Sequence, residues 1–122
     1  MVEFLRLHHI QLAIPTGSEE KCRNFWCGLL SWQERLKPAA MAERGGMWLV
    51  NGEIELHLGV ENEFRPAKKA HPAFLVHDID TLARLLNSHG YQPTWDEEIA
   101  QYKRFFVFDP VGNRLEFMQL NA

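Results

Sequence analysis

The segment GMWLVNGEIELHLGV, residues 46–60, predicts two apolar strands joined by a tight turn, and the class of fold follows from it. Asn51 and Gly52 stand at its centre, and this residue pair is a strong signal for a β-hairpin. After the turn, apolar and polar residues alternate: Ile54, Glu55, Leu56, His57 and Leu58. Because neighbouring side chains of a strand point to opposite faces, the alternation predicts a strand with one buried face and one polar face.

The segments before this hairpin complete a βαβββ order. Residues 4–14 alternate between apolar and polar side chains, which predicts a first strand. A helix is expected next, running to about Leu30. Its start is predicted at Thr16 and Glu19, which have capping-box spacing, or at Ser18 as the alternative cap. Residues 31–36 are typical of a second strand, followed by a loop through Pro38.

The same order returns in the second half of the chain. HPAFLVHDI, residues 71–79, predicts a strand, and Asp78 or Asp80 is expected to cap a helix that ends at Gly90. Residues 91–97 predict a weak strand, and residues 103–120 a second hairpin. The internal repeat predicts an α+β fold of two βαβββ modules. We expect a single domain over residues 1–122, with modules at 1–60 and 70–122.

Composition limits the partners. The chain has 122 residues, of which 46% are hydrophobic and 24% charged, and its formal net charge is −3. This balance gives no basic surface for nucleic acid or an anionic membrane. No apolar run approaches the ~20 residues of a membrane span. Cys22 and Cys27 lie on different sides of the predicted helix and cannot pair there, which is typical of a cytoplasmic protein.

Each half carries a histidine on its first strand and a glutamate on its last: His9 with Glu55, and His71 with Glu116. Alternation places all four on the sheet face that points away from the helices. By the same rule His8 points to the other face and is expected to be structural. Two imidazoles with one or two carboxylates are a first-row metal set, suited to Fe(II) or, with four ligands, to Ni, Co, Mn or Zn. The alternative is that these are ordinary surface residues.

Five segments resemble the vicinal oxygen chelate superfamily of glyoxalase I, fosfomycin-resistance thiol transferases, extradiol dioxygenases and bleomycin-resistance proteins. They are HHIQLAIP (8–15), RNFWCGLLSW (23–32), GEIELHLG (52–59), HPAFLV (71–76) and, most specific, FDPVGNRLEFMQ (108–119). The resemblance implies that the modules form a U-shaped, partly closed mixed sheet around a concave metal site. It also implies a divalent metal ion (Zn, Ni, Co, Mn or Fe) held by His9, Glu55, His71 and Glu116, with Glu55 and Glu116 as the catalytic carboxylates.

The ligand match favours a metal-dependent lyase or isomerase of glyoxalase type that acts on a small oxygen-chelating substrate. The alternatives are an extradiol-type dioxygenase, a resistance thiol transferase, and a non-catalytic protein that sequesters a small molecule. Candidate substrate contacts are His57, Trp48, Arg65 and Arg104, and His57 is also a candidate ligand or acid/base. We expect a homodimer, with the site built either within one chain or across two.

Overall fold

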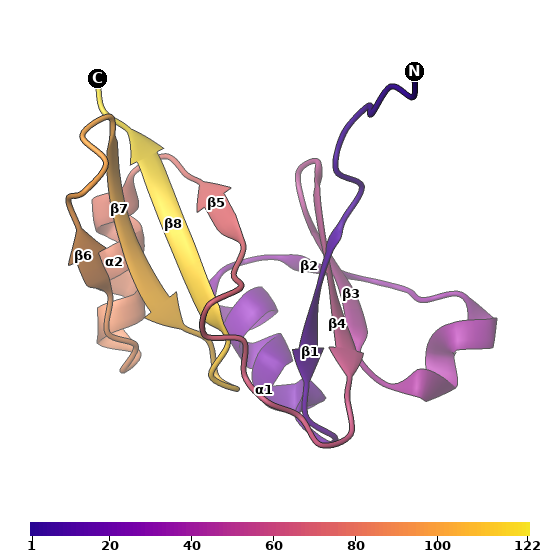
Figure 1. Ribbon diagram of the computed structural model, residues 1–122. Coiled ribbons are helices and arrows are strands. Elements are labelled where there is room, and N and C mark those ends of the chain that lie inside the picture. Colours follow the sequence, from indigo (N-terminus) through magenta and orange to yellow (C-terminus); the bar gives the residue numbers. More distant parts are fainter. The chain divides into compact units, whose positions relative to one another are not determined.

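Eight strands form two four-stranded mixed sheets, one in each half of the chain (Figure 1). The structure is a computed structural model that describes all residues, 1–122. The chain divides into two compact units, Met1–Phe64 and Arg65–Ala122, called here the first and second unit. Each unit has one βαβββ order, so the predicted α+β fold of two modules is confirmed.

The first unit contains the sheet β1-β4-β3-β2. Its elements are β1 (Ile10–Ile14), α1 (Glu19–Arg23), a π-helical turn (Asn24–Leu29), β2 (Gln33–Arg35), a 3₁₀ helix (Ala39–Arg44), β3 (Met47–Asn51) and β4 (Ile54–Val60). β1 runs parallel to β4, and the other pairs are antiparallel. The predicted hairpin is confirmed, because Asn51 pairs with Ile54 and Gly52 has a φ of 58°.

The second unit repeats this topology as the sheet β5-β8-β7-β6. Its elements are β5 (Ala73–Leu75), α2 (Ile79–Ser88), β6 (Thr94–Asp96), β7 (Tyr102–Phe108) and β8 (Arg114–Leu120). Asp78 is the N-cap of α2, and its side chain accepts a hydrogen bond from the Thr81 amide. Of the two predicted caps, Asp78 and Asp80, the first is therefore confirmed. Gly90 follows the helix at a φ of 85°. None of the helices has the length and apolar character needed to span a membrane.

One face of each sheet is buried. In the first unit the buried face and helical segment contribute Leu12, Ile14, Met47, Leu49, Leu56, Leu58, Cys22, Phe25 and Trp26. In the second unit the buried residues include Phe74, Phe105, Val107, Leu115 and Phe117, together with Ile79, Ala83 and Leu86 of α2. The opposite face of each sheet, called here the polar face, carries Trp48, Glu55, His57, Arg104 and Glu116, and His9 and His71 lie just before its strands.

The first strand is shorter than predicted. The register pairs Ile10 with Leu56, and β4 begins only two residues earlier, at Ile54. His8 and His9 precede β1, whose pairing with β4 starts at Ile10, so the rule of alternating faces does not extend to them. The Nδ1 atoms of His8 and His9 lie 3.0 Å apart. The prediction that these two rings lie on opposite faces is wrong.

The helical segment starts differently from the prediction. Ser18 stands at the N-cap position without a capping bond, and its hydroxyl donates to the Pro15 carbonyl at 2.6 Å. The predicted capping box does not form, because the Glu19 carboxylate accepts a hydrogen bond from the Gly46 amide at 3.0 Å. Glu19 thereby attaches α1 to the loop before β3. The 3₁₀ helix Ala39–Arg44 was not predicted.

Candidate functional site

His71 and Glu116 are in contact on the polar face of the second unit. His71 lies just before β5, and Glu116 lies in β8 opposite Ala73. The Nε2 atom of His71 is 2.8 Å from the Oε1 atom of Glu116. The structure therefore brings together two of the four predicted ligands within one unit.

The tautomer of His71 follows from its second contact. Its Nδ1 atom is 2.8 Å from the carbonyl oxygen of Lys69. A carbonyl only accepts hydrogen bonds, so Nδ1 carries the proton and donates it. In the neutral ring, Nε2 then presents a lone pair to Glu116, whose ionised carboxylate also only accepts. Two hydrogen-bond acceptors, Nε2 of His71 and Oε1 of Glu116, repel each other at 2.8 Å unless a positive charge lies between them. That charge is either a second proton on His71 or a cation bound to both atoms.

The other oxygen of Glu116 is occupied. Arg104, on β7, donates from Nη1 to Oε2 of Glu116 at 2.9 Å and from Nη2 to Oδ1 of Asp96 at 2.8 Å. Burial raises the pKa of Glu116, but hydrogen bonds from Arg104 and from His71 with Nε2 protonated outweigh it, so the pKa lies below its ordinary value. The carboxylate is therefore ionised at neutral pH and offers Oε1 toward His71.

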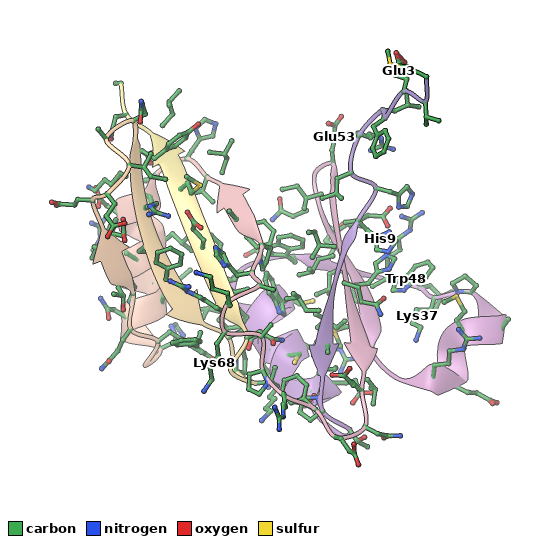
Figure 2. All side chains as sticks on the ribbon, viewed as in Figure 1. Glu3, His9, Lys37, Trp48, Glu53 and Lys68 are labelled. Atoms are coloured by element: carbon green, nitrogen blue, oxygen red, sulfur yellow. The ribbon has the colours of Figure 1, made fainter.

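A column of three rings crosses the polar face of the first unit. His57, on β4, stacks on His9 with ring centroids 4.1 Å apart and on Trp48 at 4.4 Å. Figure 2 labels His9, which directly precedes β1, and Trp48, which lies on β3; β4, which carries His57, runs between these two strands. The column buries His57, which is 6% exposed. The ring of His57 thus connects His9, which the sequence predicts as a metal ligand, with Trp48, which it predicts as a substrate contact.

Glu55 connects to this column through His57. The Nε2 atom of His57 is 3.2 Å from Oε2 of Glu55, and Arg35 donates to Oε1 of the same carboxylate. The hydrogen bond with His57 is the main cause that lowers the pKa of Glu55. His57 thus contacts both His9 and Glu55, the two ligands predicted in this half of the chain.

We expect His57 to titrate below the ordinary histidine pKa, because burial disfavours its charged form more than Glu55 favours it. Replacing Glu55→Gln removes the favourable charge and should lower the pKa of His57 further. NMR titration of the imidazole protons measures this shift. The control is Glu53→Gln, an exposed change in the hairpin turn of the same unit. A His57 pKa at or above the ordinary value, or one indifferent to Glu55→Gln, contradicts the expectation.

The remaining predicted residues are placed separately. Arg65 is exposed in the segment that follows β4, and no contact joins it to the other candidates. His9 and Glu55 lie in the first unit and His71 and Glu116 in the second. No group of three or more His, Cys, Asp or Glu side chains is arranged to hold a metal ion in the chain. The complete four-ligand set remains a prediction.

Two charged residues of these networks were missed by sequence analysis: Arg35 and Asp96. Both lie in short edge strands, β2 and β6, whose pairing partners the sequence did not identify. Arg35 pairs with Trp48 across the sheet, and Asp96 pairs with Arg104. The sequence signal that could have identified Arg35 and Asp96 is that each is a charged residue at an alternating position of a predicted strand.

Two βαβββ modules, each with histidine and glutamate on its polar face, define a two-module α+β protein of the glyoxalase type of fold. A family model, the Glyoxalase/Bleomycin resistance protein/Dioxygenase superfamily, matches residues 6–117. The chain therefore belongs to this superfamily, as the sequence resemblance predicted. None of the curated proteins compared with the chain matches it.

Solved structures agree with this assignment. A glyoxalase family protein from Bacillus anthracis is 40% identical, with a TM-score of 0.95 over 99% of this chain and 100% of that one. A glyoxalase/dioxygenase from Nostoc punctiforme is 17% identical, with a TM-score of 0.75 over 100% of both chains. TnmS3, an antibiotic binding protein from Streptomyces sp. CB03234, is 15% identical, with a TM-score of 0.74 over 98% and 100%. The last two show the fold alone.

Proposed function

We propose that the protein is a divalent-metal-dependent enzyme of glyoxalase type that acts on a small oxygen-chelating substrate. The observation that carries the proposal is the arrangement of His71 and Glu116. Nδ1 of His71 donates to a backbone carbonyl, which is how metal-binding histidines are commonly oriented. Nε2 and the ionised Glu116 then converge as two acceptors that a cation can bind together.

The donor atoms fit a first-row divalent ion. Imidazole nitrogen and carboxylate oxygen are ligands that Zn, Ni, Co, Mn and Fe accept. Two such ligands bound at about 2.1 Å and 90–109° to each other lie about 3.0–3.4 Å apart. The 2.8 Å between Nε2 of His71 and Oε1 of Glu116 is close to this range. We propose that His9 and Glu55 of a first module complete the set.

The chain's own carboxylates would move the proton. A bound divalent ion would act as a Lewis acid toward two neighbouring substrate oxygens. Glu55 and Glu116 both have pKa values below the ordinary one, so each is a carboxylate able to accept a proton at neutral pH. Glu55 is the more exposed of the two, at 21% against 7%, and is the better placed to meet a substrate from solvent.

The proposal includes a homodimer in the cytoplasm. Each unit offers one His and one Glu of the predicted set, so a complete site takes a first module and a second module. The segment before β1 exposes large apolar side chains, namely Val2, Phe4, Leu5 and Leu7. Exposed apolar surface of this kind is typical of protein contacts. A two-fold dimer would bury it, and both cysteines are free, as a reducing compartment favours.

A second candidate function is the sequestering of an aromatic compound without catalysis. The ring column of His9, His57 and Trp48 favours it, because flat rings stack on such surfaces. A protein of similar fold, TnmS3, is described as antibiotic binding. Extradiol-type oxygenation and thiol transfer use the same kind of ligand set and are distinguished by their substrates.

The test combines metal loading with activity. We expect the purified protein to bind about one divalent ion per chain and, when loaded, to convert a hemithioacetal to its thioester. Elemental analysis and the ultraviolet absorbance of the thioester measure the two results. Oxygen uptake with a catechol and Fe(II) instead would assign the dioxygenase reaction. Tight binding of an aromatic compound by protein that takes up no metal would replace the enzyme with the sequestering function.

A further inference from the structure

A chain of charged contacts crosses all four strands on the polar face of the second unit. It runs from Asp96 on β6 to Arg104 on β7, then to Glu116 on β8 and to His71 just before β5. Its links measure 2.8, 2.9 and 2.8 Å. Three of these four residues are ionised groups that lose water when buried. The contacts between them must therefore offset the free-energy cost of that desolvation.

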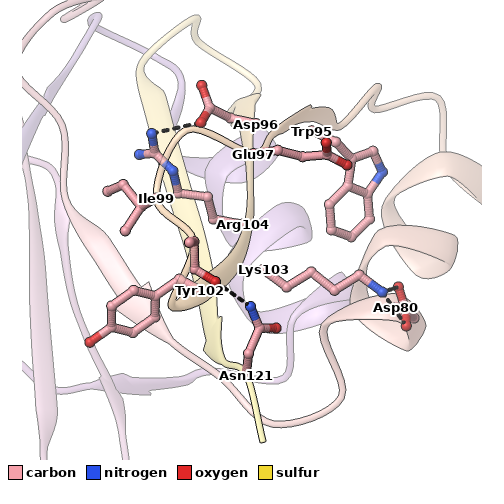
Figure 3. A pocket seen from close by; sticks show the side chains of 10 residues that line it. Asp80, Trp95, Asp96, Glu97, Ile99, Tyr102, Lys103, Arg104 and Asn121 are labelled. Carbon is pink, nitrogen blue, oxygen red and sulfur yellow. Dashed lines mark hydrogen bonds and ion pairs between the residues drawn. The ribbon is translucent and has the colours of Figure 1, made fainter.

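Burial is greatest in the middle of this chain. The side chains of Glu116 and Arg104 are 7% and 11% exposed, whereas that of Asp96 is 23% exposed. Phe106 lies beside Glu116 across the strands, and its ring centroid is 5.1 Å from the Arg104 guanidinium carbon. Asp96 and Arg104 also line a hollow of about 540 Å³ at the β6 edge (Figure 3). Both ends of this chain of contacts therefore meet solvent, because the side chains of Asp96 and His71 are each 23% exposed, whereas Arg104 and Glu116 between them are enclosed.

We propose that Arg104, held in place by Asp96, is a positioning residue that restricts Glu116 to binding a cation through Oε1 alone. This inference rests on the proposed metal function. Arg104 was selected from the sequence as a substrate contact, but its two terminal nitrogens already donate to Glu116 and Asp96. Its Nε atom is buried and has no hydrogen-bond partner. A fixed guanidinium fork orients a carboxylate in a way that a flexible ammonium does not.

Asp96 has a separate, electrostatic part in this arrangement. Asp96, Arg104 and Glu116 together carry a net charge of about −1, counting one charge per group. Without Asp96 the remaining pair would be neutral, and the attraction for a divalent ion would fall. Asp96 therefore supports metal binding by Glu116 without contacting it.

The variants separate positioning from charge. Arg104→Gln changes the net charge of the three residues from about −1 to about −2, so a purely electrostatic role predicts tighter metal binding. Positioning predicts the opposite, a loss on the order of 10–100-fold, as for other residues that orient metal ligands. Arg104→Lys restores the charge without the fork and should recover only part of the affinity. Asp96→Asn should weaken binding in the same direction.

The measurements are Zn²⁺ or Co²⁺ affinity by calorimetry and, in the metal-free protein, the imidazole nitrogen shifts of His71 by NMR. The control is Lys103→Gln. Lys103 is the neighbour of Arg104 on β7, and this change breaks its exposed ion pair with Asp80 of α2. We expect Arg104→Gln to move the His71 signals and Lys103→Gln to leave them and the affinity unchanged. Circular dichroism confirms folding, and Asp96→Asn provides the test if Arg104→Gln unfolds.

Unchanged or tighter metal binding by folded Arg104→Gln, full recovery by Arg104→Lys, or unmoved His71 signals would overturn the positioning role. If Arg104→Gln unfolds, an unchanged affinity in Asp96→Asn overturns it. Failure of the proposed function looks different, because the wild-type protein itself then takes up no metal. In that case the His71 signals of the metal-free variants still decide whether Arg104 orients Glu116.

Discussion

His71→Ala is expected to lose metal binding almost completely. A four-ligand zinc site supplies about 10–16 kcal/mol, so one ligand is worth about 2.5–4 kcal/mol, or about 10²–10³-fold in affinity. The loss should exceed the effect of any residue that only orients a ligand. Folding should survive, because His71 is partly exposed and Glu116 keeps its bond with Arg104. Calorimetry with Zn²⁺ and elemental analysis of the dialysed protein measure the change.

The matched control is His77→Ala, an exposed histidine that follows the same strand, β5. It removes an imidazole from the second unit without touching Glu116 and should leave the metal content unchanged. If His71→Ala retains the wild-type stoichiometry and affinity, His71 is not a ligand. A loss of only about 10–100-fold would make it an orienting neighbour instead.

A mixture of His9→Ala chains and Glu116→Ala chains is expected to regain metal binding that neither variant shows alone. In a dimer with shared sites, each site takes its first module from one chain and its second module from the other. The mixed dimer then has one site with both defects and one intact site. Random exchange makes about half of the dimers mixed, so about a quarter of the wild-type sites should return.

The metal concentration is set about tenfold above the wild-type Kd, where sites lacking one ligand stay largely empty. A mixture of His9→Ala and Glu55→Ala chains is the matched control, because both defects lie in the first unit and every mixed site keeps one. No recovery, despite subunit exchange seen by native mass spectrometry, would place each site within a single chain. A monomer by light scattering at micromolar concentration contradicts the dimer itself.

Local rules explain how much of this fold could be predicted. The hairpin indicated by Asn51 and Gly52, the cap at Asp78 and Gly90 after α2 each depend on a few neighbouring residues, and each is present. The alternation of Glu55 and His57 with buried leucines also held, because β4 is a central strand paired on both sides. The rule failed for His8 and His9, which precede β1 and its paired register with β4.

The partners of the candidate site residues required the folded chain. The sequence predicts Glu19 as part of a capping box, but its carboxylate accepts a hydrogen bond from the Gly46 amide, 27 positions away. It selected Arg104 as a substrate contact, whereas the register of β6, β7 and β8 aligns it with Asp96 and Glu116. Such pairings connect residues that are distant in sequence, and no local pattern encodes them.

The class of fold, the two modules and the superfamily could be predicted from the amino-acid sequence, because periodicity, turn residues and motifs are properties of short segments. It also identified His71 and Glu116 as a pair through their repeated spacing. The folded chain was needed to show that the two side chains meet, that the Lys69 carbonyl sets the tautomer of His71, and that Arg104 occupies the second oxygen of Glu116. The reason is that hydrogen-bond partners follow from strand register and burial, which arise only when the four strands of the sheet assemble.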